Sequence, residues 1–159
     1  MASSIHSLIP KLAIVVVPLG LSVASYAVYR RLVHTYDVPN GTDIFQVVEG
    51  KWALPGRAGN CDTNAVTIRF TPDHADMILI SPHLVRRDDG ELDSIVRFPL
   101  LGHTRHSIRV VRRGETRLGA DGTPVVWDLV LRSPDTYSWH RSDWLPITFT
   151  RQHQRCPGS

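Results

Sequence analysis

The stretch Ala65-Val-Thr-Ile-Arg-Phe-Thr71 alternates apolar and polar residues without interruption. Successive side chains of a β-strand point to opposite faces, so Val66, Ile68 and Phe70 share one face of the predicted strand. Threonine and arginine occupy the other face. This pattern predicts a strand with one face in a hydrophobic core and the other in solvent, as is typical of antiparallel sheets.

Similar short runs flank this strand on both sides, separated by Gly, Pro, Asp and Asn. Such spacing is typical of an all-β domain, and the stretch Asp88-Asp-Gly-Glu91 predicts a hairpin tip. Helical periodicity is not sustained in any of these runs. We expect about eight strands, at residues 44–54, 65–71, 75–81 with an extension to 85, 94–98, 107–112, 125–132, 136–141 and 146–151.

Closing such a sheet on itself removes its exposed edges. The predicted fold class is therefore mainly β, a small antiparallel β-barrel, with a β-sandwich as the alternative. The whole chain has 159 residues. Its polar, strand-rich part has the size of one domain with a single core.

The N-terminal region differs from the rest of the chain. Residues 12–29 form an apolar run without a charged residue, and Arg30 and Arg31 follow it. Such a run can cross a hydrocarbon layer of about 30 Å as a helix. We predict a transmembrane helix over residues 8–29, with a cleaved secretory signal as the alternative. The expected organisation is an N-terminal segment at 1–31, a linker at 32–43, the barrel domain at 44–156 and a tail at 157–159.

Residues at the two ends of the predicted barrel carry a family resemblance. Gly50-Lys-Trp52 stands in the first predicted strand and Arg151 in the last. This combination resembles the lipocalin-like (calycin) barrels over about residues 44–156. In those barrels the indole of a Gly-x-Trp motif packs at the closed end under an arginine from the last strand. The resemblance implies a structural role for Gly50, Trp52 and Arg151, with a cation–π contact of about 1–2 kcal/mol.

Cys61 and Cys156 are the only cysteines. A disulfide between them would close a long loop, worth about 4 kcal/mol in the chain-entropy model, and would require an oxidising compartment. Two separate buried thiols are the alternative.

The disulfide favours one cellular location over others. We expect a single-pass integral protein of the mitochondrial inner membrane with its soluble domain in the intermembrane space. A bacterial inner-membrane protein with a periplasmic domain is the alternative. Arg30 and Arg31 favour the opposite orientation, because basic flanks stay on the cytoplasmic or matrix side.

No motif in the chain predicts catalysis. A Gly-x-Ser-x-Gly elbow, a phosphate-binding glycine loop and a His-Glu-x-x-His motif are all missing from the sequence. His103 and His106 would face opposite sides of a strand, which works against a shared metal. The net charge of +3 is too small to imply a nucleic-acid partner. We therefore predict no enzyme activity, cofactor, metal or small-molecule substrate.

Two clusters predict contact surfaces. Arginines gather around one predicted hairpin, where they would meet an acidic protein surface or anionic lipid; a solvated strand edge guarded by charge is the alternative. Aromatic residues interleave with charges near the last strands, as interfaces favour, although Trp139 and Trp144 fit a core equally well. The candidate interface residues are Arg105, Arg109, Arg112, Arg113, Arg117, Tyr137, Trp139 and Trp144.

These features favour a non-catalytic accessory subunit of a multi-protein membrane complex, specifically a respiratory or other energy-transducing complex. Its partners would be other subunits and the lipid around the N-terminal helix. The first alternative is a membrane-tethered, lipocalin-like module that binds a lipid or other apolar ligand; the second is an assembly factor of such a complex. The interior separates the first two, because a carrier needs an open cavity. Large inward residues would fill a small barrel, and the sequence offers Phe70, Trp127, Leu129 and Leu131.

Overall fold

The computed structural model describes residues 34–56, 60–86, 90 and 92–158. The chain divides into a unit at Met1–His34 and a compact unit at Thr35–Ser159. The transmembrane helix predicted at residues 8–29 lies outside the described residues. Within the described ranges, no helix has both the length and the apolar character needed to cross a membrane.

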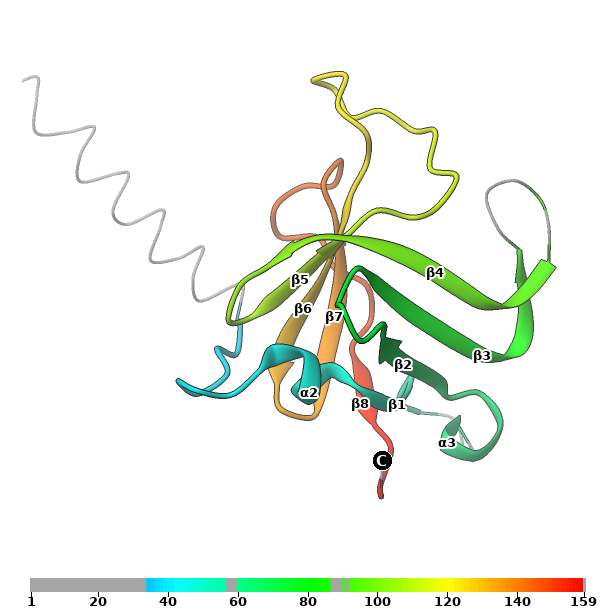
Figure 1. Ribbon diagram of the computed structural model, residues 1–159, viewed down its shortest axis with the longest axis vertical. Coiled ribbons are helices and arrows are strands. Elements are labelled where there is room, and N and C mark those ends of the chain that lie inside the picture. Colours follow the sequence, from blue (N-terminus) through cyan, green and yellow to red (C-terminus); the bar gives the residue numbers. More distant parts are fainter. Residues whose placement is uncertain (1–33, 57–59, 87–89, 91, 159) are drawn as a thin grey trace, which may run out of the picture. The chain divides into compact units, whose positions relative to one another are not determined.

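The compact unit is a closed antiparallel barrel (Figure 1). Each of the eight strands found in the described part of the chain pairs with the next, and the last pairs with the first. The mainly β class is thereby confirmed, and the β-sandwich alternative is excluded. The strands are β1 (Gly50–Ala53), β2 (Val66–Phe70), β3 (Asp76–Arg86), β4 (Leu92–His103), β5 (Ser107–Val110), β6 (Trp127–Ser133), β7 (Thr136–Arg141) and β8 (His153–Arg155).

The alternation in β2 determines which side chains enter the core. Ile68 is fully buried, and Val66 and Phe70 pack against the same core. The inward face predicted from the sequence is therefore correct. In register, Ile68 lies opposite Leu79 of β3, and Leu79 lies opposite Val96 of β4.

The first predicted strand, at residues 44–54, is partly helical. Residues Ile44–Val48 form α2, and only Gly50–Ala53 are extended as β1. The Asp43 carboxylate caps α2 by accepting a hydrogen bond of 3.0 Å from the Phe45 amide. The strand prediction for residues 44–48 was wrong because a short apolar run with β-branched residues has the same composition in a buried helical turn.

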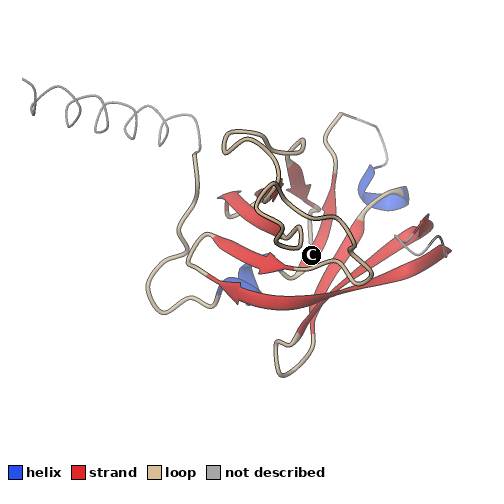
Figure 2. Cartoon of the chain, turned by 90° about the horizontal axis from the view of Figure 1, so that it is seen from above, coloured by secondary structure: helices blue, strands red, loops and turns tan. Residues whose placement is uncertain are grey.

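Helix α2 covers one end of the barrel, called here the closed end. The Phe45 ring lies 4.9 Å from that of Phe70 at the end of β2, and 4.1 Å from the His74 ring in the β2–β3 turn. It also lies 4.9 Å from the ring of His103, the last residue of β4. Figure 2 shows α2 and the second short helix, α3 (Asn60–Thr63), in blue against the red strands.

Part of the predicted linker belongs to the packed unit. The Tyr36 amide donates to the Leu131 carbonyl at 2.9 Å, and the Val38 amide donates to the Arg105 carbonyl at 2.8 Å. Val38 is only 2% exposed. The Arg105 guanidinium donates in return to the Val38 carbonyl at 2.6 Å. Packing thus begins upstream of Ile44.

The last strand begins later than predicted. The strand expected at residues 146–151 is irregular, and β8 occupies His153–Arg155 instead. Cys156, directly after β8, forms a disulfide with Cys61 in α3 across a sequence separation of 95 residues. The predicted disulfide is therefore confirmed, and it joins the β1–β2 connection to the end of the barrel.

Candidate functional site

A tryptophan–arginine pair locks the start of the barrel to its end. Trp52 is fully buried, and its indole Nε1 donates to the Val48 carbonyl at 2.9 Å. The guanidinium carbon of Arg155 lies 4.2 Å from the centre of the indole ring. Arg155 also donates to the carbonyl of Glu49 at 2.9 Å and to that of Val47. Carbonyls at a helix C-terminus lack intrahelical donors, so Arg155 caps α2 while it covers Trp52.

The sequence predicted Arg151 over Trp52. In the structure, the residue over Trp52 is Arg155. Arg151 is exposed and precedes β8. Gly50 stands where the chain leaves α2 and enters β1, with a φ of 131°. Residues with a side chain rarely adopt that conformation, which explains the glycine in the Gly-x-Trp motif.

The other end of the barrel, called here the open end, contains a cavity. Its volume is about 220 Å³, and its wall is formed by side chains of β2, β3, β4, β6 and β7 and of the segment after β5. Leu129 and Leu131 are fully buried, as a filled interior requires. Trp127, predicted to fill the interior with them, lines the cavity instead. The lining residues are Val66, Leu79, Ser81, Val85, Val96, Phe98, Arg112, Trp127 and Trp139.

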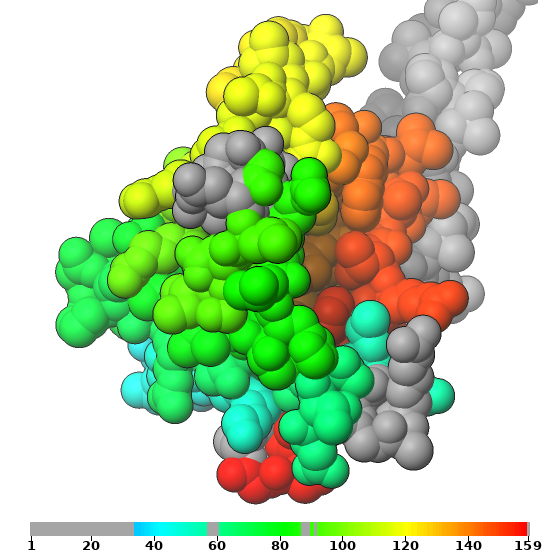
Figure 3. All heavy atoms as spheres, turned by 90° about the vertical axis from the view of Figure 1, so that its right-hand side faces the viewer, coloured from blue at the N-terminus to red at the C-terminus, as the bar shows by residue number. Residues whose placement is uncertain are grey.

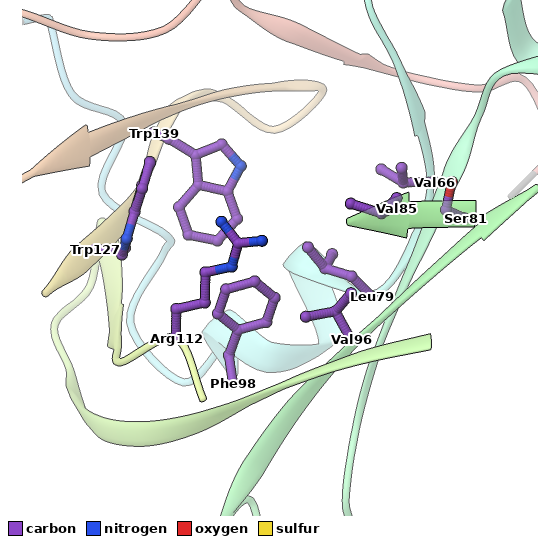
Figure 4. A pocket seen from close by; sticks show the side chains of 9 residues that line it. All are labelled: Val66, Leu79, Ser81, Val85, Val96, Phe98, Arg112, Trp127 and Trp139. Carbon is purple, nitrogen blue, oxygen red and sulfur yellow. The ribbon is translucent and has the colours of Figure 1, made fainter. Parts of the chain in front are cut away.

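The cavity has an aromatic side and an aliphatic side (Figure 4). On the aromatic side, the Trp139 ring lies 6.2 Å from the Phe98 ring and 6.1 Å from the Trp127 ring. Leucine and valine side chains of β2, β3 and β4 face them. In this view the Arg112 side chain lies with the aromatic residues rather than between the two sides. The lining is thus apolar with one cationic group, an arrangement that orients small ligands in proteins.

The barrel wall is interrupted beside this cavity. Strand β4 pairs with β5 only at its C-terminal part, from Leu100 to His103, and the Val111 amide adds a bond of 3.0 Å to the Pro99 carbonyl. On that edge of β4, no backbone pairing is found for residues 93–98 within the described part of the chain.

A polar depression of about 330 Å³ lies along this edge, called here the β4 gap. Val96 and Arg112 line both the β4 gap and the cavity, so the two spaces are neighbours. The other residues that line the gap are Asp93, Ile95, Arg97 and Arg113.

Among the described residues that line the β4 gap, arginines outnumber carboxylates. Its described lining contains three arginines and one carboxylate, that of Asp93. An oxygen of Asp93 accepts from the Ile95 amide at 2.9 Å. Arg97 and Arg113 are exposed, whereas the Arg112 guanidinium donates to the Arg86 carbonyl at 2.9 Å. Arg112 therefore joins the β3–β4 hairpin to the segment after β5.

The predicted arginine surface is divided among separate contacts. Arg109 forms a two-pronged ion pair with Asp128, at 2.8 and 3.0 Å. Arg105 binds the Val38 carbonyl, as described above, and Arg117 pairs with Glu115. Only Arg112 and Arg113 of the predicted cluster line the β4 gap.

The predicted aromatic surface is divided in the same way. Tyr137 is fully buried in the core, and burial raises the pKa of its hydroxyl. It is therefore not an exposed interface residue. Trp139 lines the cavity. Trp144 is partly exposed, with the Arg141 guanidinium carbon 4.9 Å from its ring.

A buried carboxylate organises the segment between β5 and β6, residues 111–126, which is yellow in Figure 3 at the edge of the green β3–β4 face. The Glu115 side chain is 1% exposed and accepts from the backbone amide of Arg117 at 3.0 Å and from its Nε at 2.6 Å. The hydrogen bonds from Arg117 lower the pKa of Glu115 to about 2. A charged Glu115 therefore stabilises this segment beside the open end.

The two histidines considered as metal ligands have different surroundings. His103 packs on Phe45, whereas the Nδ1 of His106 lies 2.9 Å from an oxygen of Asp37. Over the described residues, no three His, Cys, Asp or Glu side chains are grouped as a metal would need.

Comparison with known proteins gives little further guidance. No family model matches the chain, and no curated protein matches it. Among solved structures, that of Treponema pallidum Tp0751 (Pallilysin) is similar over 85% of this chain and 97% of that one, with 11% identity and a TM-score of 0.37. Similarity at this level carries no inference about fold or function.

Proposed function

We propose that the barrel binds a small apolar or amphiphilic molecule in the cavity at its open end. The observation that carries this proposal is the apolar space of about 220 Å³ among inward-facing side chains. An engineered cavity of about 150 Å³ in another protein admits benzene. The cavity here has room for one aromatic ring or a short alkyl chain, and it is smaller than the pockets of about 300–1,000 Å³ that hold drug-sized ligands.

The closed end supports the proposal because it makes the cavity pre-formed. The strands are held here by helix α2, by the Trp52–Arg155 pair and by the disulfide. All of these contacts are made within the protein, so the strands keep their positions without a ligand. A rigid site loses less conformational entropy on binding than one that must be ordered. The closed barrel and the arginine over Trp52 also favour the lipocalin-like alternative derived from the sequence.

The experiment is a titration of the full chain with phenylethanol, an uncharged single-ring probe. Trp127 and Trp139 line the cavity, so binding should change the tryptophan emission and saturate. At about 0.5 kcal/mol per non-hydrogen atom, the Kd is on the order of 1 mM.

Two adjacent positions on β3 provide the variant and its control. Leu79→Phe places a larger side chain in the cavity and should abolish the saturable signal. Ile80→Phe makes a similar change at a neighbouring position that is 38% exposed and does not line the cavity, and it should leave binding intact. Equal binding by both variants would contradict the proposal.

A contact role in a membrane complex is a second candidate. Leu118 and Leu145 are large apolar residues with 64% and 72% exposure, on the loops that follow β5 and β7, and they support an interaction surface. The accessory-subunit, respiratory-complex and assembly-factor hypotheses and the membrane location stay predictions, since residues 8–29 lie outside the described residues. Mild extraction from the native membrane followed by sizing tests the accessory-subunit hypothesis, because a chain that runs alone as a monomer contradicts it.

A further inference from the structure

We propose that the closure of the barrel at β8 is sensitive to pH: the neutral ring of His153 stabilises this closure, and protonation of the ring opens it locally. The closure, called here the β8 seam, is the pairing of β8 with β7 on one side and with β1 on the other. The inference goes beyond the proposed function and does not depend on a ligand. Its basis is the surroundings of one histidine in a very short strand.

The β8 seam is small. Strand β8 is three residues long. Its register pairs with β1 involve Arg155 and Gln154, and its pairs with β7 involve Gln154 and His153. Elements with few backbone hydrogen bonds can open at a lower free-energy cost than global unfolding. A change at His153 therefore affects a large part of the seam.

The ring of His153 belongs to the packed interior. It lies parallel to the ring of Tyr137, with 2° between the planes and 4.7 Å between the centres. Tyr137 is fully buried, and its ring lies 4.9 Å from that of Trp52. Arg155 covers the same indole from β8. His153 thus begins a row of packed side chains that ends at the arginine capping α2.

One nitrogen of this ring has no place for a proton. The Nδ1 of His153 is buried, and no hydrogen-bond partner is found for it within the described residues. A neutral imidazole carries one proton and can hold it on Nε2, whereas an imidazolium has an N–H on both nitrogens. Protonation would therefore bury a charge and a donor without an acceptor, and both are costly. In agreement with this, burial lowers the pKa of His153.

Nearby charges do not compensate for this cost. The neighbouring elements β1, β7, the β6–β7 turn and the segment of His153 itself carry the ionisable side chains Lys51, Asp135, Tyr137, His140, Arg141, Arg151 and Arg155. The carboxylate among them, that of Asp135, is paired with Arg155. Burial is the cause of the lowered pKa of His153, and no ion pair to its ring is found in the described part of the chain.

The sign of the pH dependence follows from the lowered pKa. An open seam exposes His153 to water, where its pKa returns to the ordinary value of 6.5. The closed seam is therefore most stable above pH 6.5 and loses stability as the pH falls below that value. One proton changes the opening equilibrium by at most about tenfold per pH unit. Opening at pH 5.5 should thus exceed opening at pH 7.5 by up to about tenfold.

Hydrogen exchange of the full chain, resolved by mass spectrometry, measures the opening of the seam. Intrinsic exchange rates also depend on pH, so the wild type is compared with His153→Phe at each pH. Phenylalanine keeps a ring against Tyr137 but cannot take up a proton. For peptides containing β8 and β1, the ratio of the wild-type rate to the variant rate should rise by up to about tenfold from pH 7.5 to pH 5.5. Peptides from β3 and β4 should keep a constant ratio.

The matched control is His140→Phe, the same substitution at a histidine of β7 whose Nδ1 does have a partner, the Thr148 carbonyl oxygen at 2.8 Å. This variant should keep the pH dependence of the wild-type seam. Should His153→Phe fail to fold, His153→Gln provides a second variant that cannot be protonated, with the same loss of pH dependence expected.

Three outcomes would overturn the inference. The first is a seam whose exchange has the same pH dependence in the wild type and in the His153 variants. The second is a seam that exchanges more slowly in the wild type at pH 5.5, because a cation–π attraction to Tyr137 would then outweigh the cost at Nδ1. The third is an equal rise in every peptide of the barrel, which would mean that His153 affects global stability and not the seam.

Discussion

Replacing Arg155 by glutamine should destabilise the barrel strongly. The change removes the guanidinium 4.2 Å from the Trp52 ring and its hydrogen bonds to the carbonyls of Glu49 and Val47. The Arg155 side chain is only 18% exposed, so solvent does not replace these contacts well. Asp135, its ionic partner at 3.4 Å, is 74% exposed and adds little.

The magnitude follows from these contacts. A partly desolvated cation–π contact contributes about 1–2 kcal/mol, and each hydrogen bond from a charged donor contributes about 1.5–3 kcal/mol. These contributions are not additive in one side chain, so we expect a loss of about 3–5 kcal/mol. With a urea dependence of about 1–3 kcal/mol per M, the unfolding midpoint should fall by roughly 2 M.

Urea unfolding of the full chain, followed by tryptophan emission and far-ultraviolet circular dichroism, measures this loss. The matched control is Arg151→Gln, which removes the same charge at an exposed position four residues earlier, and should change stability by less than about 0.5 kcal/mol. Two results would refute the reasoning: a loss below about 1 kcal/mol for Arg155→Gln, or an equal loss for both variants.

Two further predictions concern the disulfide and Glu115. Changing both Cys61 and Cys156 to serine should lower the free energy of unfolding by about 4–5 kcal/mol, because the bond spans 95 residues; a urea midpoint equal to that of the oxidised chain would contradict this. The pKa of Glu115 falls from an ordinary 4.5 to about 2 on folding, so its stabilisation is complete above about pH 5 and disappears as the pH approaches 2. Glu115→Gln should therefore lower the free energy of unfolding by about 1–2 kcal/mol at pH 7 and by almost nothing near pH 2. A loss that urea unfolding finds to be independent of pH would show that packing, and not charge, explains the effect.

The alternation of apolar and polar residues predicts which side chains enter the barrel interior. The direction of a side chain depends only on its position within its own strand. The inward face of β2 and the burial of Leu129 and Leu131 follow from a period of two residues. The position of Asp128 has the same origin: it lies opposite Arg109 on the outer face, since the neighbouring Leu129 points inward. The local sequence pattern is enough to predict the inward residues of a strand whose one face is apolar and whose other face is polar.

The elements at the two ends of the barrel domain, α2 and β8, were harder to predict, because tertiary contacts determine where they form. The sequence did contain a signal for α2, since Asp43 is a good N-cap residue, but five residues are too few to show helical periodicity. Strand β8 consists of His153, Gln154 and Arg155, with no apolar alternation to reveal it. Its position depends on the disulfide at Cys156 and on the contact with Trp52, and both join residues distant in sequence.

The cavity could not be predicted because an inward residue on a strand either fills the interior or lines a space within it. Trp127 and Leu129 share one face of β6, yet Leu129 is fully buried while Trp127 lines the cavity. The difference arises outside β6. At the closed end α2 adds Ile44, Phe45 and Val48 to the core, and the open end has no equivalent helix among the described residues.

At the open end, Arg112 contributes a charged side chain to the cavity wall. Its guanidinium reaches the Arg86 carbonyl at 2.9 Å, and so it connects the β3–β4 hairpin to the segment held by Glu115. A charged group there disfavours collapse into a dry core, because burial of a cation is costly without compensation. The side chain that links the two sides of the opening is thus also the one that keeps the cavity accessible.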